Sequence, residues 1–147
     1  SGAIDRQHHP APITLRSPPL FVAQQTRLTP MTIDVLRAKL HRITITEANV
    51  DYIGSITLDQ DLVDASGLVE GEKVQVLNVN NGNRLETYVI LGKRGTGEVC
   101  LNGPAALRAS VGDVVIVIAY ARMTVEEARA FRPTVVFPDE RTNRLKP

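Results

Sequence analysis

Short apolar segments and polar turns alternate along the chain from residue 31 onward. Within the segments, β-branched and other hydrophobic residues mostly recur at every second position, which is the period of a half-buried β-strand, and Gly, Asn and Asp separate the segments. The pattern predicts strands over Val35–Thr46, Ser55–Leu58, Val74–Asn78, Arg84–Leu91, Glu98–Leu101, Val114–Tyr120 and Thr134–Phe137. We therefore expect a mainly β domain.

Helical signals are few and short. Asp59 is placed to cap a helical turn that runs through Ser66 and stops at the following glycine. Thr124 and Glu127 have the spacing of a capping box that opens a helix to Ala130. Neither helix is long enough to supply a core, so the sheet must bury the apolar side chains.

One six-residue pattern occurs twice. Gly71–Val76 and Gly112–Val117 both read Gly, acid, any residue, Val, any residue, Val. Each copy puts an acidic turn residue before a strand, and two copies favour a pseudo-twofold closed barrel without exposed strand edges. Coincidence between two similar turns explains so short a pattern equally well. Between the copies, Asn80–Asn83 is a tight hairpin signal, because Asn and Gly tolerate positive φ.

Residues 1–30 differ from the rest of the chain. They hold five of the nine prolines, three arginines, one acid and no convincing periodicity. We expect a flexible extension outside the folded domain, which we place at residues 31–147. A leader, a vector remnant or an overlong start upstream of Met31 would each explain this extension. His8 and His9 fit a solvated pair better than a metal site.

Charge and cysteine content argue against several functions. The chain has 17 basic and 16 acidic side chains and a formal charge of +1, so no broad basic field is available to attract nucleic acid. One cysteine, Cys100, with three histidines offers neither a disulfide nor zinc-type spacing, and we expect this cysteine in the core. We expect a metal-free protein of the reducing cytoplasm. The apolar run Val114–Ala119 is far short of the roughly 20 residues that span a membrane.

Five short motifs follow one another along the folded part. They are Lys39-Leu40-His41-Arg42, Tyr52-Ile53-Gly54-Ser55, Asp59-Gln60-Asp61, Asn81-Gly82-Asn83-Arg84 with Thr87-Tyr88, and Asn102-Gly103-Pro104-Ala105-Ala106. In order and spacing they resemble the aspartate decarboxylase family, over about residues 31–138. The resemblance implies a six-stranded double-psi β-barrel with short helices, assembled as a homotetramer. It also implies decarboxylation of L-aspartate to β-alanine for pantothenate and coenzyme A synthesis.

The dipeptide Gly54-Ser55 has chemistry of its own. A serine hydroxyl can attack the preceding carbonyl and convert the amide into an ester, if the backbone is strained and the oxyanion is stabilised. Gly54 has no Cβ and tolerates such a conformation. Elimination of the ester would leave dehydroalanine, and hydrolysis would give a pyruvoyl group. A Gly-Ser pair alone is an ordinary turn, so it is the resemblance that implies self-cleavage, into residues 31–54 (or 1–54) and 55–147.

The resemblance also implies roles in and after that cleavage. Asn102 helps to hold the oxyanion, and the Thr87 hydroxyl contacts the Gly54 carbonyl and promotes attack. The pyruvoyl group formed from Ser55 is the covalent cofactor, whose ketone forms a Schiff base with the substrate amine while the adjoining carbonyl accepts electrons as CO2 leaves. Without the resemblance, Asn102 is a turn residue and Thr87 a plain strand residue. An accessory maturation protein is a further partner that the sequence leaves open.

Aspartate brings two carboxylates, so its binding needs cations. The resemblance assigns Arg84 to one carboxylate through a bidentate fork, and Lys39 is the expected second positive contact. It gives Tyr88 the task of protonating the carbanion left by decarboxylation. The other residues expected to line the pocket or contact substrate are His41, Tyr52, Thr87, Gly103, Ala105 and Ala106. A half-buried packing role fits His41 equally well.

Strand geometry constrains these assignments. In a regular strand, Arg84 and Tyr88 share one face about 13 Å apart, while Thr87 points to the other face. One flat strand cannot aim all three at one small molecule, so either a bulge redirects Thr87 or neighbouring subunits complete the site. We expect the second arrangement, with active sites at subunit interfaces.

Two departures from the family pattern and two other functions bear on this interpretation. Leu77 stands where some relatives carry tryptophan, and Pro104 replaces an alanine and has no amide proton, so Ala105 or Ala106 would have to supply one.

A non-catalytic β-barrel or swapped-hairpin regulator that reads DNA would share the repeated strand starts, but the near-neutral charge argues against it. A pyruvoyl decarboxylase of another amino acid would look alike, because one methylene is worth only about 1 to 3 kcal/mol in a pocket.

Overall fold

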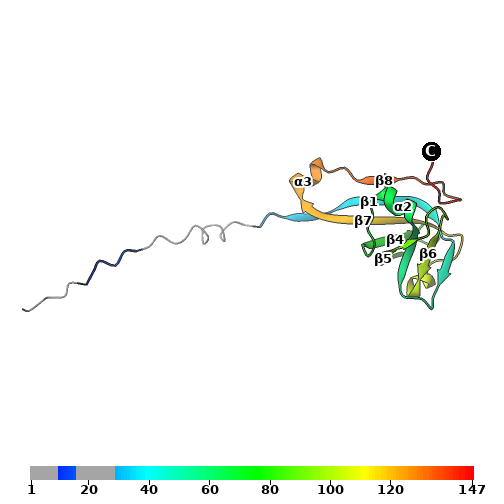
Figure 1. Cartoon of the computed structure of the whole chain (residues 1–147), viewed down its shortest axis with the longest axis horizontal. Helices are drawn as coiled ribbons and strands as arrows, with labels where there is room; N and C mark the ends of the chain where they lie inside the picture. The colour runs from blue at the N-terminus through cyan, green and yellow to red at the C-terminus, as the bar shows by residue number, and fades with distance from the viewer. Residues whose placement is uncertain (1–9, 16–28) are drawn as a thin grey trace, which may run out of the picture. The chain divides into compact units, whose positions relative to one another are not determined.

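A computed structural model describes residues 10–15 and 29–147. Contacts within the chain group Met31–Pro147 into one compact unit and Ser1–Pro30 into another. His8 and His9 lie outside the described residues. All of the helices and strands below belong to Met31–Pro147 (Figure 1). In the ranges that the structure describes, no helix has the length and apolar character needed to cross a membrane.

The unit is built mainly from β-strands. In chain order its elements are β1 (Thr32–Thr44), β2 (Glu47–Asn49), β3 (Ser55–Asp59), α2 (Gln60–Ser66), β4 (Lys73–Asn78), β5 (Arg84–Gly92), β6 (Val99–Asn102), the 3-10 helix η1 (Gly103–Arg108), β7 (Val114–Thr124), α3 (Val125–Ala130) and β8 (Thr134–Val136). Every predicted strand and both predicted helices are present, with ends that differ by up to four residues. The sequence did not predict β2, which is too short to show a period, or η1.

Both α-helices are capped as their sequences predict. The Asp59 carboxylate accepts a hydrogen bond from the backbone N–H of Asp61 at 2.8 Å, and α2 ends at Gly67 in the left-handed conformation. In α3, the Thr124 hydroxyl accepts from the Glu127 N–H and the Glu127 side chain accepts from the Thr124 N–H. These local bonds fix where each helix begins.

Six of the strands close into a ring. Hydrogen bonding gives the order β2-β6-β3-β5-β4-β7-β1-β8. Just beyond the end of β1, the Thr46 N–H donates to the Val99 carbonyl at 2.8 Å, and the Val99 N–H donates to the Thr46 hydroxyl at 2.9 Å. These bonds join β1 to β6 and close a barrel of β6, β3, β5, β4, β7 and β1. The two short strands β2 and β8 are added beside β6 and β1.

The chain crosses this barrel twice in the same way. β3 leads through α2 to β4, although β5 lies between β3 and β4 in the sheet. Likewise, β6 leads through η1 to β7, although β1 lies between them in the closed ring. Each crossover therefore passes a strand from the other half of the chain. This interlocked topology is the expected six-stranded double-psi β-barrel with short helices.

The repeated sequence pattern marks a local twofold axis. Val76 and Val117 are equivalent positions in the two copies, and they pair with each other between the antiparallel strands β4 and β7. The glycines that open the copies also make matching backbone bonds at 2.8 Å, one to Val89 on β5 and the other to Ile45 just after β1. The duplication is therefore structural and not a coincidence of two turns.

Alternation along β3 and β6 separates the core from an outer face. Ile56, Leu58 and Leu101 are fully buried in a core that also takes apolar residues from β1, β4, β5 and β7. Successive side chains of a strand point to opposite sides. The residues between these core positions therefore share the outer face, and they are Ser55, Thr57, Cys100 and Asn102.

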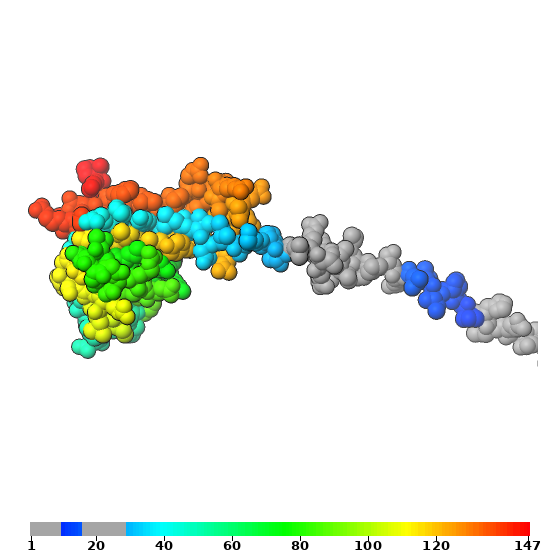
Figure 2. Space-filling model, turned by 180° about the vertical axis from the view of Figure 1, so that it is seen from behind, coloured from blue at the N-terminus to red at the C-terminus, as the bar shows by residue number. Residues whose placement is uncertain are grey.

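The C-terminal segment runs along β1 (Figure 2). Beyond β8, the Asn143 side chain accepts from the Thr44 N–H at 2.7 Å and donates to the carbonyls of Thr44 and Gly97, both at 2.8 Å. Asn143 is buried and has φ +60°, a left-handed conformation that Asn adopts more readily than most residues. One side chain thus ties the end of β1 to the turn between β5 and β6.

Candidate active site

Ser55 and Asn102 face each other across β3 and β6. They are paired in the antiparallel register and so share one face of the barrel. Both are buried, with 0% and 4% of their surface exposed. The Asn102 Nδ2 donates to the Ser55 Oγ at 2.8 Å, and the Ser55 hydroxyl donates to the Ile53 carbonyl at 3.3 Å. A serine oxygen with an amide donor on it thus lies at the start of β3, directly after the Gly54-Ser55 peptide bond.

Gly103 packs directly on the backbone of Gly54. It has φ +66°, and a Cβ on Gly103 would lie 2.7 Å from the Gly54 Cα and 2.8 Å from the Gly54 N. A Cβ on Gly54 would meet only an ordinary contact, 3.7 Å from the Pro104 Cδ, and Gly54 is not among the glycines with positive φ. We expected glycine's conformational freedom to matter at Gly54. In the uncut chain it is required at Gly103 instead.

Tyr88 lies next to Ser55 on the neighbouring strand. β3 and β5 are adjacent and parallel, and Ile56 pairs with Val89. The preceding residues of the two strands, Ser55 and Tyr88, are therefore neighbours, whereas Gly54 precedes β3 and has no paired residue on β5. Tyr88 is exposed and Thr87 is half-buried in the alternating pattern of β5, so the two side chains point to opposite faces as predicted. Tyr88 therefore shares the outer face with Ser55.

A pocket of about 320 Å³ opens beside the Ser55–Asn102 pair. Its walls include Tyr52, Thr57, Cys100 and Asn102, together with residues of β2 and the end of β5. Two of the predicted site residues, Tyr52 and Asn102, thus line one cavity. Ser55 does not line this cavity, but the Asn102 side chain that is bonded to its hydroxyl does.

Two further side chains hold Asn102, and neither was predicted to do so. The Asn102 Nδ2 also donates to the Thr57 Oγ1 at 3.0 Å, and the Cys100 thiol donates to the Asn102 Oδ1 at 3.1 Å. Burial, reinforced by two nearby glutamates, raises the pKa of Cys100 to about 11. Cys100 is buried as expected, but it faces Asn102 and not the core. For Thr57 a signal existed, because strand alternation puts it on the same face as Ser55.

The predicted substrate-binding cations lie farther along the outer face. Arg84 begins β5, four residues before Tyr88, and its guanidinium donates to the Gln75 Oε1 at 2.6 Å. Lys39 pairs with Ile118 of β7, which pairs in turn with Gln75 of β4. Paired residues point to the same surface of a sheet, so Lys39, Gln75 and Arg84 all point outward, with β4 and β7 between the strands of the two cations.

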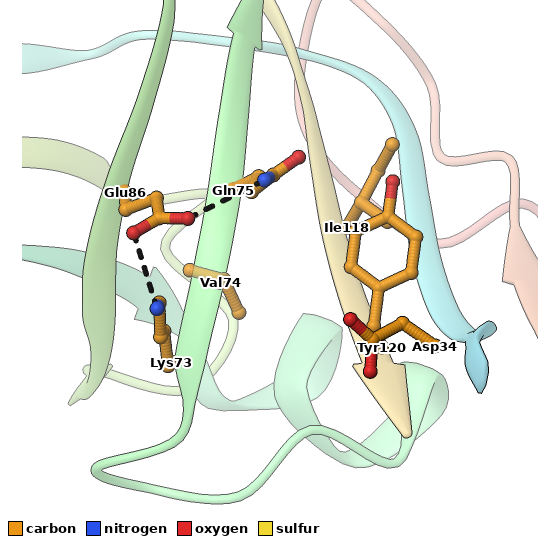
Figure 3. Close-up of a pocket in the computed structure, with 7 residues that line it drawn as sticks. All are labelled: Asp34, Lys73, Val74, Gln75, Glu86, Ile118 and Tyr120. Atoms are coloured by element: carbon orange, nitrogen blue, oxygen red, sulfur yellow. Dashed lines mark hydrogen bonds and ion pairs between the residues drawn. The ribbon is translucent and has the colours of Figure 1, made fainter. Parts of the chain in front are cut away.

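A second pocket, of about 220 Å³, lies on this face among β1, β4, β5 and β7 (Figure 3). Lys73 and Glu86 form an ion pair at 3.1 Å on one side of it, and Tyr120 stands on the other side. The hydrogen bonds from Lys73 and then Gln75 lower the pKa of Glu86. The Glu86 carboxylate is therefore balanced by Lys73.

His41 contacts the C-terminal segment and is not among the residues that line these two pockets. Its ring meets Phe137 edge to face, with ring centroids 5.4 Å apart. Burial lowers the pKa of His41, and Lys39 and Arg42 lower it further against the opposing effect of Glu140. Among the described residues nothing bonds to its buried Nδ1. Of the two roles left open, the structure favours packing.

The three small residues predicted to contact substrate belong to η1, and they are Gly103, Ala105 and Ala106. Pro104 occupies the first turn of this helix, where a missing N–H removes no helical bond. Asn102 precedes η1 but makes no side-chain cap, because its amide is already engaged. Pro104 therefore costs η1 no helical hydrogen bond.

Fold and site together define a class of protein: a double-psi β-barrel with a serine buried at a Gly-Ser peptide bond, an amide donor on its oxygen and two cations on its outer surface. The family model described as aspartate decarboxylase matches residues 31–146. The chain belongs to the aspartate decarboxylase family.

Individual relatives match over nearly their full length. The aspartate 1-decarboxylase of Parabacteroides distasonis is 58% identical over 78% of this chain and 99% of its own. The aspartate 1-decarboxylase of Christiangramia forsetii is 59% identical over 79% of this chain and 100% of its own. Among solved structures, the rationally designed mkDPBB_sym_86 protein is 24% identical with a TM-score of 0.42, over 60% of this chain and 96% of its own.

Proposed function

We propose that this chain cuts itself between Gly54 and Ser55 and then decarboxylates L-aspartate to β-alanine and CO2. The relatives that it matches over nearly their full length carry the name of this activity. The observation that carries the proposal is the buried hydrogen bond of 2.8 Å from the Asn102 Nδ2 to the Ser55 Oγ. It puts a donor at the one serine whose hydroxyl the resemblance assigns to self-cleavage. We place the reaction in the cytoplasm, where the buried free thiol of Cys100 would stay reduced.

The surroundings of Ser55 fit a pyruvoyl group. Ser55 is the first residue of β3, so a break before it would leave it at a new N-terminus that is still held by pairing with Asn102. When formed, the group supplies a ketone that takes up the substrate amine and withdraws electrons as CO2 leaves. Tyr88 stands beside Ser55 on the same face, which suits a phenol that returns a proton to the substrate.

Arg84 and Lys39 supply the positive charge that a dicarboxylate substrate needs. The bond to Gln75 fixes the guanidinium of Arg84 at one end while leaving its other N–H groups free to bind a carboxylate as a fork. Lys39 also points outward, from β1, which β4 and β7 separate from the strand of Arg84, and it is the second cation offered to a carboxylate. A substrate with one carboxylate would leave one of these cations unpaired.

We propose further that subunits of a homotetramer complete the site. Tyr88 lies beside Ser55, whereas Arg84 begins the same strand about 13 Å away, too far for one aspartate to contact both. Apolar side chains around Ser55 are also exposed in the isolated subunit, for example Ile53 at 71% and Tyr88 at 37%. A neighbouring subunit would cover these side chains and bring its own Arg84 and Lys39 to Ser55.

The first test is the denatured mass of freshly purified and warmed protein, with and without a carbonyl-trapping hydrazine. We expect fragments that meet at Gly54 and Ser55, hydrazine uptake by the fragment that begins at residue 55, and β-alanine from L-aspartate. Ser55→Ala is the matched control and should stay whole and inactive. A wild-type chain that stays uncut after prolonged warming, alone and with cell extract that could supply a maturation protein, would overturn the proposal.

The interface is tested by mixing subunits. Arg84→Ala and Tyr88→Phe should each be cut normally and be inactive alone. If one subunit supplies Arg84 and its neighbour supplies Tyr88, tetramers assembled from both variants should regain part of the activity. Mixed tetramers without any recovery would place both residues in a single subunit's site.

A further inference from the structure

The side-chain amide of Asn102 has two different ends, and only one of them can serve the proposed cleavage. Its NH2 group can donate to an oxygen that gains negative charge, whereas its Oδ1 can only accept. The direction of the amide is therefore as important as its position. In the structure the NH2 group points to the Ser55 Oγ at 2.8 Å.

Two neighbours hold the amide, and the thiol is the one that favours this direction, because a hydroxyl can donate or accept. The Cys100 thiol donates to the Asn102 Oδ1 at 3.1 Å, and the Thr57 hydroxyl accepts from the Asn102 Nδ2 at 3.0 Å. If the amide turned by 180°, its NH2 group would lie against the thiol sulfur, which is a weak acceptor. Asn102 and Cys100 are both largely buried, so the reversed amide would exchange a hydrogen bond for a poor contact with sulfur.

We propose that Cys100 and Thr57 are positioning residues for self-cleavage, which lock the amide of Asn102 with its NH2 group on the Ser55 oxygen. This inference rests on the proposed function. In the cleavage step a bond forms between the Ser55 Oγ and the carbonyl carbon of Gly54, and the C–N bond between Gly54 and Ser55 breaks. The hydroxyl proton ends on the released amine. The negative charge develops on the carbonyl oxygen of Gly54, which shares the attacked carbon with Oγ, so an NH2 group held at Oγ lies next to the place where the oxyanion forms.

The thiol can act as a donor throughout the neutral range. Its burial raises the pKa of Cys100 to about 11, so it keeps its proton well above the pH at which an exposed cysteine ionises. A thiolate at this place would repel the Asn102 Oδ1 and favour the reversed amide. The environment of Cys100 therefore favours the protonated thiol, which can donate a hydrogen bond, over the thiolate, which would act as a nucleophile.

The test compares variants that keep and lose each hydrogen-bonding group. Cys100→Ser and Thr57→Ser keep a hydroxyl, whereas Cys100→Ala and Thr57→Val remove the donor or the acceptor at similar volume. We expect the first pair to convert to fragments at nearly the wild-type rate and the second pair to be slower by about three- to tenfold each, the range of a single hydrogen bond. The rate is read from the denatured mass of the full chain over time.

A double-variant comparison separates positioning from general packing. When Asn102 is replaced by Ala, the amide is gone, and Cys100→Ala should slow the residual cleavage no further. Equal rates for Cys100→Ala, Thr57→Val and wild type, or an equal loss in Cys100→Ser and Cys100→Ala, would overturn the inference while the proposed function stood. A wild-type chain that is never cut between Gly54 and Ser55 would overturn both.

Discussion

Asp59 and Asn102 occupy equivalent places in the two halves of the barrel, yet their side chains do different things. Each is the residue before a crossover helix, at the N-cap of α2 or of η1. The Asp59 carboxylate caps α2 and also accepts from the N–H groups of Gly95 and Gly97, at 3.0 and 2.7 Å. The Asn102 amide caps nothing and is directed to Ser55.

This difference shows how a duplicated framework separates stability from chemistry. The half that contains α2 has a regular α-helix with a side-chain cap at its start and a left-handed glycine at its end. The half that contains η1 has a 3-10 helix without a side-chain cap. The cap is missing where the side chain is bonded to Ser55, and if this bond serves the proposed cleavage, the second half gives up local stabilisation for the arrangement of the site.

The largest effect is expected from Asn102→Ala. Removing one preorganised oxyanion donor typically slows a reaction by about 10²- to 10³-fold, and we expect a comparable loss in the rate of cleavage at Gly54-Ser55. The mass of the warmed chain measures this rate, and urea unfolding of the uncut chain shows whether the barrel remains stable. If Asn102→Ala is cut at the wild-type rate, Asn102 has no part in cleavage. The contrast between a stabilising Asp59 and a reacting Asn102 would then be wrong.

Gly103→Ala is the next change and has a matched control in the other half. A Cβ on Gly103 would press on the backbone of Gly54, and a displacement of about 1 Å at a reacting group can cost about 100-fold in rate. Gly67 also has positive φ, but a Cβ there would meet only the end of the Arg37 side chain at 4.0 Å. Gly67→Ala should therefore cost about 1 to 2 kcal/mol of stability and leave cleavage unchanged. Equal cleavage rates in the two variants would contradict the role of Gly103.

Asp59→Asn should lower stability and leave cleavage unchanged, whereas Asn102→Ala should mainly slow cleavage. Asp59→Asn keeps the size of the side chain and one acceptor oxygen but loses charge-assisted bonds, so the free energy of unfolding near neutral pH should fall by about 2 kcal/mol. The cleavage rate under native conditions should stay the same. Slow cleavage in a folded Asp59→Asn barrel would mean that the two halves are not separate in function.

The effect of Asp59 should also depend on pH. Burial acts to raise the pKa of its carboxyl, but the N–H groups of Gly97, Asp61 and Gly95 and the charge of Arg144 outweigh burial and lower the pKa below 3.8. Because the folded pKa lies below the unfolded one, the stabilisation is complete above the unfolded pKa and is lost as the pH falls through the folded pKa. The difference in unfolding free energy between wild type and Asp59→Asn should therefore shrink below about pH 4. A difference that stays constant from neutral to acid pH would contradict this assignment.

The two halves also differed in how far the sequence could predict them. The helix of the first half is bounded by Asp59 and a glycine a few residues away, and such local signals predicted α2 correctly. The bonds that make the site join residues far apart, such as Asn102 with Ser55 and Thr57, and no local pattern reports such distances. The resemblance supplied Asn102 and Ser55. Cys100 was correctly expected to be buried, but its bond to Asn102, two residues along the same strand, was not predicted, because a small apolar residue in a strand looks like simple packing.

The smallest loss of stability is expected from changing Asn143, which binds the same turn at Gly97 as Asp59 does. The Gly97 carbonyl accepts from Asn143, and the Gly97 N–H donates to Asp59, so the two side chains share one turn. Asn143→Gly keeps a residue that accepts φ +60° and removes three hydrogen bonds, and we expect a loss of about 1 to 2 kcal/mol in urea unfolding.

Combined with Asp59→Asn, this change should cost less than the sum of the two separate losses, because either change alone already loosens the turn at Gly97. Asn143→Asp, which keeps one acceptor but loses both donated bonds, should be at least as destabilising as Asn143→Gly. Fully additive losses would mean that Asn143 and Asp59 stabilise the barrel independently. A loss of cleavage in Asn143→Gly as large as in Gly103→Ala would show instead that this corner also positions the Gly54-Ser55 bond, and the division between a stabilising half and a reacting half would fail.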